Sequence, residues 1–132
     1  MLGDRNRALG KADLAVSQLR EAVRLATAEG DEPRLVANLI RLGTAWQYAG
    51  EHVVAESTLR QGLDAAERLG LRDMVGYAFQ HLGKCLAELG KIHEAHGCFL
   101  AALEVRMALG EPGLVRSTEQ ALEALSSLRR SP

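Results

Sequence analysis

A step of 40 residues constrains the fold of this chain more than any other feature. Leu42-Gly43 returns as Leu82-Gly83 at this step. Two sets of glycines keep the same spacing: Gly10, Gly50, Gly90 and Gly30, Gly70, Gly110. A fixed period in this range is typical of repeat proteins, in which each unit packs on the next. The sequence therefore predicts one domain over 1–132, with units at about 1–30, 31–70 and 71–110 and a capping helix at about 112–130.

The apolar spacing inside each unit predicts a pair of helices. Leu39, Leu42 and Trp46 are three and four residues apart, which is the spacing of one buried helix face. Gly50 and Gly70 stand where such helices end. We therefore expect an all-α fold of helical hairpins and no strands. The expected helices cover 2–9, 11–29, 33–49, 52–69, 72–89, 92–109 and 114–128, with a turn at Gly10.

Gly43 falls in the middle of an expected helix, where glycine costs about 1 kcal/mol relative to alanine. Such a cost indicates a packing requirement. We expect the second helix of the hairpin to approach closely, with Ala55 opposite Gly43. Gly83 and Ala95 repeat this pair in the next unit.

Composition and charge exclude several classes of partner. The 132 residues carry 16 basic and 17 acidic side chains, for a net charge of −1, and nucleic-acid binders usually show a basic excess. No stretch reaches the roughly 20 apolar residues of a membrane-spanning helix, and Met1–Arg5 lacks the apolar run of a signal peptide. We expect a cytoplasmic protein that binds neither nucleic acid nor membranes, with Cys85 and Cys98 as reduced, buried thiols.

Residues suited to catalysis or metal binding are sparse. His93 and His96 are three apart on one helix face, and Glu88 or His52 could complete a metal site, but no Cys/His quartet or zincin motif is present. The chain has no phosphate-binding glycine loop, and its serines have no His/Asp partner at a readable spacing. We therefore expect no enzyme, no catalytic residue, no metal and no cofactor.

The repeat resembles the tetratricopeptide repeat (TPR). The resemblance is carried by Leu42-Gly43-x-x-Trp46-x-x-x-Gly50-x-x-x-x-Ala55-x-x-x-Leu59-x-x-Gly62-Leu63 and by its copy 40 residues later. It extends over essentially the whole chain and is similar to the 40-residue variant of kinesin light chains and of bacterial regulator sensor regions. Gly62, Leu86 and Asn6 depart from the family pattern. The resemblance implies a right-handed α-α superhelix of about three hairpins plus a C-terminal capping helix.

The resemblance also implies a concave groove lined by the first helix of each unit. Its lining would bind a peptide or helix of a partner protein, and it consists of Arg7, Ile40, Arg41, Thr44, Gln47, Tyr48, Tyr77, Gln80, His81, Lys84, Glu88 and Gln120. Tyrosine and arginine are common in recognition surfaces. The carboxylate clamp of chaperone-binding relatives is absent. The alternatives are a face that is merely solvated, a homodimer through the apolar face of 11–29, and a ligand-sensing domain of a bacterial regulator.

Overall fold

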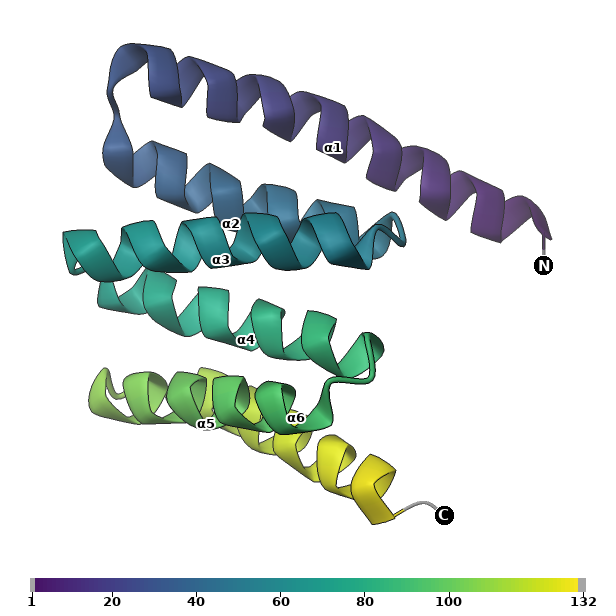
Figure 1. The fold of residues 1–132 in the computed structure, drawn as a ribbon, viewed down its shortest axis with the longest axis vertical. Helices are drawn as coiled ribbons and strands as arrows, with labels where there is room; N and C mark the ends of the chain where they lie inside the picture. The colour runs from purple at the N-terminus through teal and green to yellow at the C-terminus, as the bar shows by residue number, and fades with distance from the viewer. Residues whose placement is uncertain (1, 131–132) are drawn as a thin grey trace.

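The computed structural model describes residues 2–130, together with the side chains of residues 10–128, and this part of the chain is built from α-helices (Figure 1). The helices are α1 (Leu2–Glu29), α2 (Glu32–Tyr48), α3 (His52–Leu69), α4 (Arg72–Glu88), α5 (Ile92–Ala108) and α6 (Pro112–Arg130). No strand occurs in this part of the chain. The predicted all-α fold of TPR-like hairpins with a terminal capping helix is confirmed.

The connections between helices are short, and they contain glycines where the backbone is left-handed. Gly50 has φ 84° and Gly70 has φ 70°, in the left-handed region where only glycine is free of strain. Asp31 precedes α2, and its carboxylate accepts a hydrogen bond from the Arg34 backbone N–H at 3.3 Å. The predicted helix ends from α2 onward therefore agree with the structure to within about two residues.

The predicted turn at Gly10 is wrong. α1 runs without a break from Leu2 to Glu29, and Gly10 lies inside it with no left-handed φ. A continuous helix adds one backbone hydrogen bond per residue, whereas a turn would require the preceding segment to find a surface on which to pack. The first unit is thus one long helix, which projects beyond the other helices in Figure 1, while α2–α3 and α4–α5 are complete hairpins.

In each of the two hairpins, the second helix packs closely against a glycine of the first helix. A Cβ at Gly43 would lie 2.5 Å from Leu59 Cγ, and one at Gly83 would lie 2.7 Å from Phe99 Cε1. The close approach predicted at Gly43 is therefore present, but the side chain that fills the space is Leu59 and not Ala55. Ala55 is itself fully buried, one turn earlier on α3.

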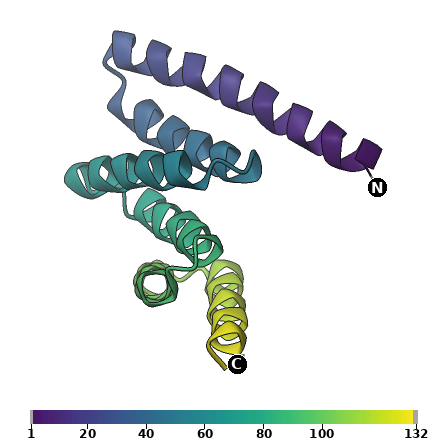
Figure 2. The same cartoon turned by 45° about the vertical axis from the view of Figure 1, so that its right-hand side comes forward.

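The hairpins stack because each helix has apolar residues on more than one side. α3 packs on both α2 and α4, and α5 packs on both α4 and α6. One continuous core runs through this stack and includes the buried side chains of Val36, Leu59, Leu82, Phe99 and Leu125. Successive helices are rotated relative to one another, so α5 is seen end-on in Figure 2 while α2 and α3 are seen from the side.

Candidate binding groove

An open hollow of about 470 Å³ lies between the first helices of the two complete hairpins. We call it the α2–α4 groove, and it is lined by Ala37, Ile40, Arg41, Thr44, Asp73, Met74, Tyr77 and His81. Five of the predicted site residues meet there, namely Ile40, Arg41, Thr44, Tyr77 and His81. They converge because residues three and four apart share a helix face, and equivalent positions of α2 and α4 lie side by side.

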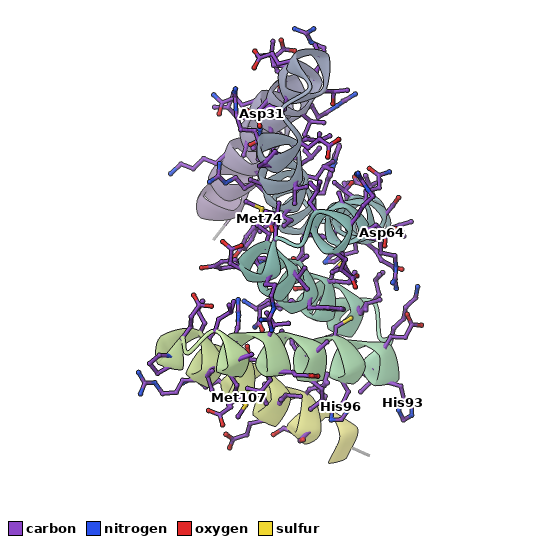
Figure 3. All side chains as sticks on the ribbon, turned by 90° about the vertical axis from the view of Figure 1, so that its left-hand side faces the viewer. Asp31, Asp64, Met74, His93, His96 and Met107 are labelled. Carbon is purple, nitrogen blue, oxygen red and sulfur yellow. The ribbon has the colours of Figure 1, made fainter. Side chains whose placement is uncertain are left out.

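The middle of the groove is apolar. Ile40 is 7% exposed and belongs to the core, so it forms a floor more than a contact surface. Tyr77 is 41% exposed, and Met74 lies one turn before it, where α4 meets α2 in Figure 3. Met74 and Asp73 were not predicted to line the groove, although their spacing of three and four residues from Tyr77 places them on its face.

The groove carries opposite charges at its two ends. Asp73 lies in the first turn of α4. Arg41 lines the groove toward its other end, and Lys84 lies just beyond this end, one turn after His81 on α4. Neither cation has a carboxylate at ion-pair distance among the described side chains. Burial, together with the positive charges of Lys84 and Arg106, lowers the pKa of His81 to about 4. His81 is therefore neutral at pH 7, and this end of the groove is positive.

A buried arginine packs against the ring of Tyr77. The guanidinium carbon of Arg106, on α5, lies 5.2 Å from the centroid of the Tyr77 ring, which is a cation–π distance. Arg106 Nη1 donates to Thr118 Oγ1 at 2.8 Å and to Gln80 Oε1 at 3.2 Å. Burial lowers the pKa of Arg106. This group joins α4, α5 and α6 and fixes the position of Tyr77.

Gln80 is not a groove residue, which corrects the sequence prediction. It is 3% exposed, and its Oε1 accepts the bond from Arg106. Gln80 lies one turn after Tyr77 on α4, but α5 and α6 close over its side chain. Arg106 was missed, yet the 40-residue step offered a signal, because it stands where the other units have Ala26 and Ala66.

The remaining predicted residues lie outside the α2–α4 groove. Lys84 and Glu88 line a second hollow between α4 and α6, and Gln47 Nε2 donates to Glu88 Oε1 at 2.8 Å. Tyr48 is 74% exposed near the end of α2. Gln120 is exposed on α6. The side chain of Arg7 is outside the described part of the chain.

The candidate metal residues remain dispersed. Figure 3 shows His93 and His96 on the first turns of α5, on a surface remote from Met74. Among the described residues, no group of three or more His, Cys, Asp or Glu side chains is placed to hold a metal ion. His52 instead contacts the carboxylate of Glu88. Within the same part of the chain, none of the helices is apolar over a length that would cross a membrane.

Comparison with known proteins identifies the fold. A TPR-like helical-repeat protein, BtubC (BKLC) from P. vanneervenii, has a crystal structure that matches with a TM-score of 0.71. The match covers 96% of this chain and 67% of that chain, at 18% sequence identity. No protein-family model matches the sequence, and no curated protein matches it. At this identity the similarity establishes a TPR-like architecture and leaves the ligand to be inferred from the groove.

Proposed function

We propose that this protein is an interaction scaffold that holds a segment of another protein in the α2–α4 groove. The observation that carries the proposal is an open hollow that combines apolar contact surface with Arg41, while Lys84 lies just beyond its end, and neither cation has an acidic partner among the described side chains. Buried apolar contacts would supply affinity, and the charges would select and orient the ligand. The proposed function is binding, and no catalytic step enters it.

The spacing of the charges suggests what the segment contains. Asp73 and Lys84 are 11 residues apart on α4, which is about 16 Å along the helix. An extended peptide crosses this distance in about five residues. The groove would therefore suit a short segment with an acidic side chain at the Arg41 and Lys84 end and an apolar or aromatic side chain against Tyr77.

Calorimetry with designed peptides tests this proposal. Peptides of about ten residues, each with two glutamates and one leucine or tyrosine, are compared with counterparts that carry glutamine instead. We expect the acidic peptides to bind at least about tenfold more tightly, because each cation then gains a partner. Binding of both sets with equal affinity, or of neither set, would overturn the proposal.

A charge-reversal pair tests where the peptide binds. Arg41→Glu with Lys84→Glu should leave the helical circular dichroism spectrum unchanged and abolish binding of the acidic peptides. Arg20→Glu with Arg116→Glu changes the net charge equally, on α1 and on α6 outside the groove. This control should retain binding to within a factor of about three. Loss of binding in both pairs would mean that net charge, and not the groove, attracts the peptide.

Self-association is the second candidate function. One observation favours it, because α1 contacts α2 alone among the described helices. The same groove is also compatible with a ligand-sensing role. If a free amino acid or dipeptide binds as tightly in the calorimetric titration as the peptides of about ten residues, ligand sensing is favoured over peptide binding.

A further inference from the structure

One face of α1 lacks the helix that covers the equivalent face in the other units. By the 40-residue step, Ala15 and Leu19 correspond to Ala55 and Leu59. Ala55 and Leu59 are 0% exposed because α2 and α4 pack on α3. Ala15 and Leu19 are only half-buried. The uncovered surface is therefore the one that the first helix of the same unit would occupy.

By the same step, residues 2–9 correspond to the last part of this missing helix. Leu2-Gly3 holds the place of Leu42-Gly43, and Gly43 is the residue that packs against Leu59. By the same step, Gly3 is matched to Leu19. Both residues lie in the continuous α1, 16 positions apart, which separates them by about 24 Å. A straight α1 therefore cannot bring its own residues 2–9 onto Leu19.

We propose that two copies of this chain exchange these segments, so that residues 2–9 of one chain cover Ala15 and Leu19 of the other. The two α1 helices would be antiparallel, with the two-fold axis near residue 11. In such an exchange, two chains make with each other the same contact that the two helices of a hairpin make within one chain. The contact surfaces are therefore already complementary. The proposal is independent of any ligand in the α2–α4 groove.

The register is fixed by the pair Gly3 and Leu19, which places residue 11 at the two-fold axis and residue 7 opposite Ala15 of the second copy. The backbone of α1 projects beyond α2 in Figures 1 and 2.

Light scattering gives the first test. The contact extends over about 28 Å of helix, which is small beside a standard interface of about 800 Å² per partner, so we expect a micromolar dissociation constant. The molar mass should rise from one chain to two between about 1 and 500 µM. A monomer at every concentration would overturn the proposal.

Disulfide trapping identifies the contact itself. Chains with Gly3→Cys and chains with Leu19→Cys are mixed in a Cys98→Ser background, since Cys85 is fully buried. The proposal predicts a heterodimer on a non-reducing gel, because the equivalent pair Gly43 and Leu59 is in close contact. Leu25→Cys serves as the control, because Leu25 is exposed on α1 beyond the exchanged segment, and it should not be trapped by Gly3→Cys.

The alternative occupant of the uncovered face is the same chain, folded back at Gly10. A single chain with both Gly3→Cys and Leu19→Cys distinguishes the two cases. A covalent dimer supports the exchange, whereas an internal disulfide in a monomer overturns it, as does the absence of any disulfide. Inserting Gly-Asn-Gly after Gly10 should let the segment fold back and raise the dissociation constant at least about tenfold. An unchanged dissociation constant would contradict the exchange.

Discussion

The substitution Gly43→Ala isolates the packing that holds the α2–α3 hairpin together. A Cβ at this position would lie 2.5 Å from Leu59 Cγ, 2.7 Å from Leu59 Cδ2 and 3.3 Å from the Leu59 backbone nitrogen. Leu59 is 0% exposed, so its side chain has no open space into which to move. The added methyl group must therefore displace either the leucine or the α3 backbone.

The expected size of the effect comes from a comparison with Gly97. Gly97 lies inside α5, and a Cβ there would meet nothing within 4 Å, so Gly97→Ala should stabilise the protein by up to about 1 kcal/mol. Gly43→Ala brings the same gain in helix propensity, but the added methyl group overpacks the hairpin at a cost of about 1–3 kcal/mol. For a chain of this length, the two variants should differ in melting temperature by about 4–11 °C.

Thermal and urea unfolding, followed by circular dichroism at 222 nm, measure this difference. A double variant adds a second check, because Leu59→Ala removes the atoms that an alanine at position 43 would meet. Leu59→Ala should therefore cost about 1 kcal/mol less in the Gly43→Ala background than in the natural sequence. Equal shifts for Gly43→Ala and Gly97→Ala, or strict additivity in the double variant, would refute the close-packing argument.

Three further predictions concern buried or half-buried side chains. Leu82→Ala empties a fully buried site and should lower the free energy of unfolding in urea by about 2–5 kcal/mol, so a loss under about 1 kcal/mol would contradict it. The pKa of His81 is about 4 in the folded protein and 6.5 in its ordinary state, so the unfolded chain binds the proton at a higher pH than the folded chain does. The free energy of unfolding should therefore fall by about 2 kcal/mol between pH 7 and pH 5. His81→Gln should abolish this part of the pH dependence, and parallel stability curves for the two proteins would refute it. Burial raises the pKa of Cys85 to about 11, so in Cys98→Ser protein Ellman's reagent should label Cys85 at pH 8 only after unfolding, and rapid labelling of the folded protein would contradict this.

The helix ends were predictable because the interactions that set them are local. A left-handed turn at Gly50 or Gly70 and a side-chain cap at Asp31 depend on residues within one turn of each other. Gly10 has the same place in the repeat, yet it is helical. Its conformation depends on whether residues 2–9 find a surface, and that is not a property of the local sequence.

The groove was predictable to the extent that helix faces determine it. Arg41 and His81 meet because the step of 40 residues places them at equivalent points on α2 and α4. Gln80 was misplaced because its burial depends on how α6 packs and on Arg106, a charged residue at a position where the other units have alanine. A single substitution in a repeat can therefore move a neighbouring residue from the surface into the core.

The proposal of a peptide-binding groove is tested most directly by amide chemical-shift mapping during a titration with one of the acidic peptides. The account predicts that the largest shifts fall on Ala37, Thr44, Tyr77 and His81, which line the α2–α4 groove, and that the amides of α3 and α5 on the opposite side of the hairpins move little. Shifts concentrated on α3 or α5, or no shifts at millimolar peptide, would contradict it.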